Sequence, residues 1–215
     1  MASEYTSDEI WSMVRDERAA LVDALSALSP EQWMSDTLCG EWDVEDVTAH
    51  LVAASRTGTP AWLLAMAAAG FDPDRFNARK VRRFRGAGAE ETLAMLRASV
   101  SSQVAPFGSA LGLLGEVIVH GQDIARPLGL DLLPDADALD ALASFFASKN
   151  FAVPSARIAK GLRLESTDTA LRAGPAGAPS VRGTTLALVM VMAGRIAYLP
   201  ELSGDGVDEL PDRLG

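Results

Sequence analysis

Two histidines are the only imidazoles in the 215-residue chain, and their surroundings favour a metal site. His120 follows Glu116 by four residues, so on a helix both side chains can point to one spot. The pair lies in an apolar stretch, and a buried charge must be paired or bound to a metal. His50, also flanked by apolar residues, is the only other imidazole for the same site. Two histidines and one carboxylate with an open position are typical of catalytic zinc and equally of non-haem iron.

The residues near this set each have more than one interpretation. Both histidines have a structural alternative, because helices often carry the Glu-x-x-x-His spacing by chance. Asp46, one turn before His50, is placed to hold the ring N–H of that histidine. Asp123 and Arg126 lie on the helix face of the second histidine, where they form an ion pair that closes the helix or support the metal site. Trp42, close to the first histidine, is a core residue or a stacking surface for a ligand.

Helices must position these side chains, and the sequence predicts one at each histidine. Asp43 can cap a helix that begins at Val44 and carries His50 two turns later. A helix over residues 109–125 carries the second histidine and ends before Pro127. Further helices are predicted over residues 8–28, from residue 30, and over residues 61–70, 89–104 and 135–149.

The pattern changes after residue 150. Residues 162–167 alternate with a period of two, which is typical of a strand, and residues 169–172 resemble its hairpin partner. Val181 opens a short third strand. Residues 184–193 are almost entirely apolar, and periodicity cannot decide there between helix and strand. The predicted fold is an α-helical bundle over residues 1–150 followed by a small α+β domain over residues 151–215.

Composition narrows the class of protein. No apolar stretch reaches the roughly 18 residues that a membrane span needs, and the acidic N-terminus lacks the apolar core of a secretory signal. The single cysteine, Cys39, cannot form an internal disulfide, so we expect a cytoplasmic protein. With 19 basic and 29 acidic residues, the net charge of −10 disfavours nucleic acid as a partner.

One basic segment departs from this average. Its six cations leave 13 basic against 29 acidic residues elsewhere, a net charge of −16. Weak periodicity between Pro73 and Gly88 predicts a loop with one helical turn over residues 72–88. The segment is a solvated loop, a loop that gates anions at the metal site, or a nucleic-acid patch, the last disfavoured by the charge elsewhere. The cations are Arg75, Arg79, Lys80, Arg82, Arg83 and Arg85.

Two segments around the histidines resemble the signatures of a known family. The sequence from Leu38 to Leu51, LCGEWDVEDVTAHL, is similar to the opening signature of the metal-binding domain of mycothiol-dependent maleylpyruvate isomerases. The sequence from Glu116 to Gly129, EVIVHGQDIARPLG, resembles the second signature of that family. Residues 163–195 resemble its small C-terminal domain. The resemblance implies a DinB-like four-helix bundle with a metal between its helices.

The resemblance also implies a metal-dependent enzyme that works with a low-molecular-weight thiol. It implies His50, Glu116 and His120 as ligands, zinc as the usual metal and mycothiol as the co-substrate. Addition of the thiol to a conjugated carbon gives a single bond that rotates, and elimination restores the double bond in the other geometry. An isomerase completes this cycle, whereas an S-transferase stops after the addition. The substrate is then a small anion, bound by Arg195 or alternatively by Arg182.

Other roles and partners stay open at this point. Trp42 and Arg126 are the candidates for contact with the thiol cofactor. Cys39 is a nucleophile near a helix start or a buried structural cysteine. The alternative function is a non-catalytic, metal-binding stress or regulatory protein of the same fold, and a weaker one is a carrier whose apolar ligand lies along residues 186–193. A second copy of the chain is kept as a candidate partner.

Overall fold

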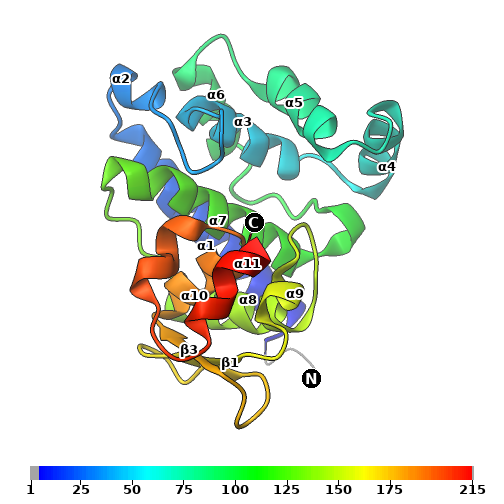
Figure 1. Cartoon of the computed structure of the whole chain (residues 1–215). Helices are drawn as coiled ribbons and strands as arrows, with labels where there is room; N and C mark the ends of the chain where they lie inside the picture. The colour runs from blue at the N-terminus through cyan, green and yellow to red at the C-terminus, as the bar shows by residue number, and fades with distance from the viewer. Residues whose placement is uncertain (1–4, 215) are drawn as a thin grey trace. The chain divides into compact units, whose positions relative to one another are not determined.

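The computed structural model describes residues 5–214, which form two compact units (Figure 1). One unit comprises Ser7–Leu133, and the other comprises residues 5–6 together with residues 134–214. Within residues 5–214, no helix is both long and apolar enough to cross a membrane.

The first unit is built on a four-helix bundle, as predicted. Helices α1 and α3 each pack against both α6 and α7, while α5 packs along α3. Apolar side chains from the four bundle helices form a shared core that includes Leu25, Val47, Leu96 and Ile124. The elements of the unit are α1 (Ser7–Ser26), α2 (Pro30–Trp33), α3 (Val44–Ala54), α4 (Thr59–Ala68), α5 (Pro73–Phe84), α6 (Ala89–Arg97), the 3-10 helix η1 (Pro106–Gly108) and α7 (Ala110–Leu128).

Local sequence signals fix the ends of the two helices that carry the histidines. The Asp43 side chain accepts the Asp46 N–H at 2.7 Å and caps α3. Ser109 caps the start of α7 through the Gly112 N–H, and Gly129 ends it in the left-handed conformation at φ 63°. Both boundaries agree with the predicted ones to within a few residues.

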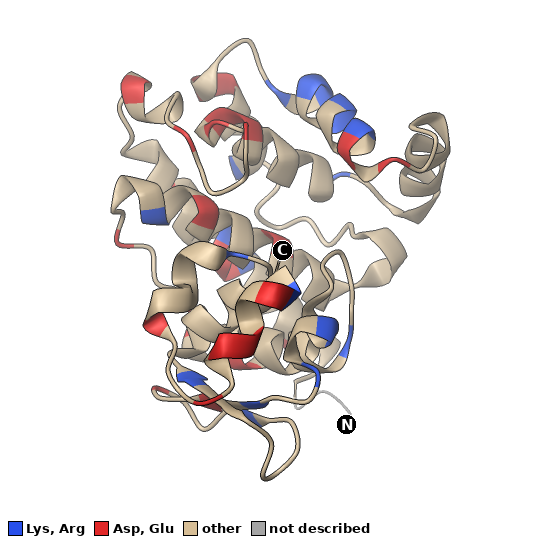
Figure 2. Cartoon of the chain, in the orientation of Figure 1, with Lys and Arg blue, Asp and Glu red and all other residues tan. Residues whose placement is uncertain are grey.

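The predicted loop over residues 72–88 is wrong, because most of it is helix α5. Asp72 caps this helix by accepting the Arg75 N–H at 3.0 Å, and Pro73 occupies the first turn. Figure 2 shows a row of basic residues along α5. The helix is amphipathic, but the pattern comes mainly from exposed basic residues, because Val81 is its only fully buried residue and its packing on α3 involves few apolar side chains.

A buried arginine joins α1 to the segment that follows α6. Arg18 is 1% exposed and donates from one guanidinium nitrogen to the backbone carbonyls of Ser99 and Ser102. The other terminal nitrogen is buried without a hydrogen-bond partner in the described part of the chain. Burial lowers the pKa of Arg18 to about 10.

We expect Arg18→Ala to reduce the free energy of unfolding by roughly 2–4 kcal/mol, because it leaves a cavity and two unpaired carbonyls. Arg18→Met keeps most of the side-chain volume and removes the cost of burying a charge, so it should cost less. Denaturant unfolding of both variants measures the difference. If Arg18→Met is as unstable as Arg18→Ala, the volume of the side chain does not explain the loss of stability, which would contradict this prediction.

The second unit combines helices with a three-stranded sheet of order β2-β1-β3. Strand β1 pairs antiparallel with β2 and parallel with β3, with Leu164 opposite both Ala173 and Val181. Between residues 5 and 214, the named strands all lie after residue 155, as predicted, although an isolated bridge joins Asp36 to Asp43. The elements are α8 (Ala136–Ser148), α9 (Ser155–Ala159), β1 (Arg163–Ser166), β2 (Arg172–Ala173), β3 (Ser180–Gly183), α10 (Thr185–Met192), η2 (Ile196–Glu201), η3 (Val207–Glu209) and α11 (Leu210–Leu214).

The apolar segment after β3 is a helix, which settles the choice that periodicity left open. Thr184 caps α10 by accepting the Ala187 N–H at 3.2 Å. Leu188, Val189 and Met190 are each 1% exposed or less, and α10 packs against α8, β1 and β3. Helix α8, which the sequence analysis assigned to the bundle, therefore packs in this unit. The apolar side chains of α10 form its core.

Candidate metal centre

The structure brings His50, Glu116 and His120 together between α3 and α7. Nε2 of His50 lies 2.9 Å from Oε2 of Glu116, and Nε2 of His120 lies 3.4 Å from the same oxygen. The two imidazole rings are edge to face with their centroids 4.8 Å apart. One ligand atom from each residue lies within 4.8 Å of the others. The sequence predicted this set from one local spacing and one distant histidine.

The three side chains are largely removed from solvent, with exposed fractions of 14%, 22% and 15%. Burial alone raises the pKa of the Glu116 carboxyl, but hydrogen bonds from both imidazoles outweigh it and hold this pKa well below its usual range. Burial also lowers the pKa of His120, yet hydrogen bonds to Asp123, Cys39 and Glu116 raise it well above the usual value. The site therefore concentrates one negative charge between two basic rings.

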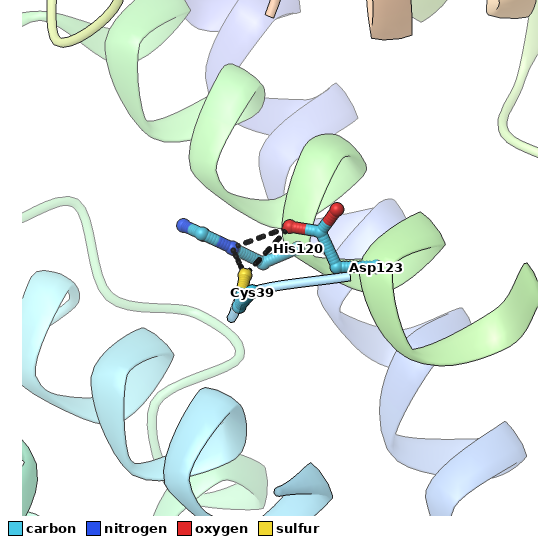
Figure 3. A group of neighbouring side chains, drawn as sticks. All are labelled: Cys39, His120 and Asp123. Carbon is cyan, nitrogen blue, oxygen red and sulfur yellow. Dashed lines mark hydrogen bonds and ion pairs between the residues drawn. The ribbon is translucent and has the colours of Figure 1, made fainter. Parts of the chain in front are cut away.

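A second cluster consists of Cys39, His120 and Asp123, whose side chains converge in Figure 3. It lies at Nδ1 of His120, whereas Glu116 lies at Nε2. Nδ1 of His120 is 3.0 Å from Oδ2 of Asp123, which is fully buried. The Cys39 thiol donates to the same oxygen at 2.9 Å, and its sulfur lies 3.3 Å from Nδ1. With a metal in place of the Nε2 proton, a carboxylate at Nδ1 would favour the tautomer that keeps its proton on Nδ1 and leaves Nε2 to bind the metal.

This arrangement bears on both predictions for residues around the histidines. For Asp123 the sequence left two roles open, an ion pair that closes the helix and support of the metal site. Its contact with His120 agrees with support of the metal site. The expectation that Asp46 holds the His50 ring is wrong, because Arg85 forms an ion pair with the Asp46 carboxylate. Nδ1 of His50 is buried and makes no hydrogen bond to any described residue.

The acidic start of α3 explains where Asp46 points. Arg85, the last of the six cations, also pairs with Asp43 at 3.1 Å and with Glu45 at 2.9 Å. The three carboxylates lie close together at the N-cap and first turn of α3, and Arg85, just after α5, offsets the repulsion among them. Part of the basic segment is thus structural.

The remaining predicted site residues lie in different surroundings. The Trp42 ring is 5.2 Å from the His50 ring, centroid to centroid, so Trp42 borders the site. Arg126 is exposed near the end of α7. In the second unit, Arg182 on β3 is exposed and lies 3.7 Å from a Glu165 oxygen, while the half-buried Arg195 donates to the Ala193 carbonyl at 2.7 Å.

The donor set fits a divalent metal with a preference for nitrogen and oxygen ligands. Bonds of about 2.1 Å at a tetrahedral angle separate two ligand atoms by about 3.4 Å. The His120–Glu116 separation is 3.4 Å, whereas the His50–Glu116 distance of 2.9 Å is that of a hydrogen bond. The His50–Glu116 contact would have to widen by about 0.5 Å to reach the separation of two ligands on one tetrahedral metal.

Comparison with known proteins supports the resemblance predicted from the sequence. Residues 14–107 match the family model described as "Mycothiol maleylpyruvate isomerase N-terminal domain". The chain is also similar to the crystal structure of the mycothiol-dependent maleylpyruvate isomerase, with a TM-score of 0.64 and 15% identity over 94% of this chain and 93% of that one. A histidine-to-alanine mutant of that enzyme gives a TM-score of 0.61 with the same identity and coverage. A search of curated protein sequences finds no match.

The family match covers only part of the candidate metal site. The family match includes Cys39, Trp42 and His50 but ends before Glu116 and His120. At 15% identity the structural similarity shows a shared fold. The contacts of Glu116 and His120 in this chain are therefore what supports two ligands from α7.

Proposed function

We propose, from the membership of residues 14–107 in the mycothiol maleylpyruvate isomerase N-terminal domain family, that this protein is a metal-dependent enzyme that uses a low-molecular-weight thiol such as mycothiol. Its substrate is a small anionic electrophile, and the reaction is a geometric isomerisation or an S-transfer. The metal is a divalent ion, with Zn²⁺ favoured, held by His50, Glu116 and His120. The observation that carries the proposal is the convergence of these three ligand atoms within 4.8 Å.

A bound Zn²⁺ with three protein ligands would supply a Lewis-acidic position at which the pKa of an incoming thiol is lowered. The side chains of the protein do the rest. Glu116 offsets the positive charge, and both histidines fix the open position between α3 and α7. Asp123 holds His120 through Nδ1, so that Nε2 stays directed at the site.

Two residues near the ligand set are proposed to bind the thiol co-substrate. Trp42, 5.2 Å from His50, provides an apolar surface beside the ligand set on which the thiol carrier can pack. Arg126 is the candidate for a polar contact with the carrier. The reacting sulfur adds to a conjugated carbon of the electrophile. Rotation about the new single bond and elimination of the thiol then give the other isomer and regenerate the thiol.

An arginine of the C-terminal unit is proposed to bind the substrate carboxylate, with Arg195 favoured over Arg182. Charge-assisted hydrogen bonds contribute about 1.5–3 kcal/mol, so we expect Arg195→Gln to raise KM roughly 10- to 100-fold while metal content stays unchanged. Arg182→Gln is the matched control with the same change at the alternative residue. Steady-state kinetics of both variants decides between them, and an unchanged KM in both would remove the arginine contact from the proposal.

Product analysis tests the proposed reaction directly. The metal-loaded protein is incubated with mycothiol and a panel of small unsaturated carboxylates in the cis form, including maleylpyruvate, and followed by proton NMR. An isomerase produces the trans form with no net loss of thiol. A transferase consumes one thiol for each electrophile. Absence of any reaction across the panel, with metal bound, would refute the enzymatic proposal and favour a non-catalytic metal-binding protein.

A further inference from the structure

Two hydrogen bonds connect the loop before α3 to Asp123 of α7. The Leu38 N–H donates to the Asp123 backbone carbonyl at 3.1 Å. The neighbouring Cys39 thiol donates to the Asp123 carboxylate at 2.9 Å. Residues Cys39 and Asp123 are 84 positions apart, so this anchor is a tertiary contact.

Pro127 makes the backbone part of this anchor available. In an α-helix the carbonyl of Asp123 would accept the N–H of the residue four positions later, but that residue is Pro127, which has no N–H. The carbonyl is therefore free to accept the Leu38 N–H from outside the helix. By leaving this carbonyl without a partner inside the helix, Pro127 allows the loop to bind beside His120.

The same loop continues into the helix that carries the other histidine. The Thr37 hydroxyl accepts the Cys39 N–H at 3.1 Å and donates to the Trp42 carbonyl at 2.8 Å, which keeps the loop compact. Asp43 then caps α3. Cys39 is consequently bonded to the partner of His120 and is only a few residues from the start of the helix that carries His50.

We propose that Cys39 is a positioning residue for the ligand set, an inference that rests on the proposed metal-binding function. Its thiol holds the Asp123 carboxylate against Nδ1 of His120, and this fixes the direction in which Nε2 points. The thiol lies on the Nδ1 side of the ring, away from the nitrogen that faces Glu116. A role as the attacking nucleophile at the metal is therefore disfavoured.

The distances favour a positioning role over direct metal binding by Cys39. Its sulfur, Nδ1 of His120 and Oδ2 of Asp123 also form a group that could hold an ion. A tetrahedral metal with bonds of about 2.3 Å to sulfur and 2.1 Å to oxygen would separate those atoms by about 3.6 Å. The observed distance between sulfur and Oδ2 is 2.9 Å and would have to widen by about 0.7 Å, more than the His50–Glu116 contact, before both atoms could bind one metal.

Metal affinity provides a test that does not depend on activity. We expect Cys39→Ala to weaken Zn²⁺ binding about 10-fold in a chelator competition, as for other groups that orient a metal ligand. Cys39→Ser retains a donor to Asp123 and should bind within about threefold of the unmodified protein. Val81→Ala, at a buried position of α5, is the control for a general loss of packing. It should lower the melting temperature of the metal-free protein without changing affinity.

The outcomes separate this inference from the proposed function. If the unmodified protein binds metal and Cys39→Ala binds it equally well, the positioning role is overturned and the metal site stands. If Co²⁺ produces a thiolate charge-transfer band that Cys39→Ala removes, Cys39 is a ligand and the positioning role is also overturned. If the unmodified protein binds neither Zn²⁺ nor Co²⁺, both the inference and the proposed function fail. The loss in Cys39→Ala together with rescue in Cys39→Ser supports the inference.

Discussion

Replacement of His120 by alanine is expected to weaken Zn²⁺ binding by more than about 100-fold, beyond the loss caused by changing a group that only orients a ligand. The variant loses a ligand nitrogen and also leaves the buried Asp123 carboxylate without its imidazole partner. His50→Ala removes the second ligand nitrogen, Glu116→Gln removes the negative charge of the carboxylate ligand, and both should have effects of similar size. Elemental analysis after dialysis should then change from about one metal per chain to a trace.

The glutamate allows a matched control for this prediction. Glu90→Gln makes the same substitution at an exposed residue in the first turn of α6 and should leave the metal content unchanged. Circular dichroism of each metal-free variant shows whether the bundle has folded. Full metal content in both folded histidine variants would exclude this site, whatever the activity of the protein.

Removal of the metal is expected to lower thiol-dependent turnover at pH 7 by at least about 30-fold, and addition of Zn²⁺ should restore it. The reason is the fraction of thiol that is ionised. With an ordinary pKa of about 8.5, only about 3% of a free thiol is thiolate at pH 7, and a Lewis-acidic metal removes this limit. The protein treated with a chelator is compared with the same sample after Zn²⁺ is returned.

The pH dependence gives a second measure of the same effect. Between pH 6 and 8, the residual rate without metal should rise about tenfold for each pH unit, because the thiolate fraction does so below the pKa. The metal-loaded rate should depend less steeply on pH in this range, since the thiol is already ionised. Equal rates and equal slopes with and without metal would refute the proposed mechanism.

Local sequence determined the parts of the site that lie within one helix. Glu116 and His120 are four residues apart, and the helix period alone places both on one face. Capping residues also specified the helix starts, since Asp43 and Ser109 bond to the first turns that follow them. These interactions span only a few residues, so their geometry follows from the chain itself. The bundle and the later strands were predictable for the same reason.

Packing between distant segments decided the rest. His50 reaches Glu116 from 66 residues away, and Cys39 reaches Asp123 from 84 residues away, so no local period indicates either contact. The sequence spacing predicted a hydrogen bond between Asp46 and His50. Instead, Arg85, just after α5, forms an ion pair with the Asp46 carboxylate.

The two segments that the sequence left wrong or undecided failed for opposite reasons. Helix α5 has a helical period, but most of the contrast comes from its basic residues, because Val81 is its only fully buried residue. Helix α10 is apolar on every side because it fills the core of its unit, so it has no polar face from which a period could be recognised. A hydrophobic pattern reports a helix only when one face is buried and the other is solvated. In both helices, burial by tertiary contacts decided what the sequence pattern could not.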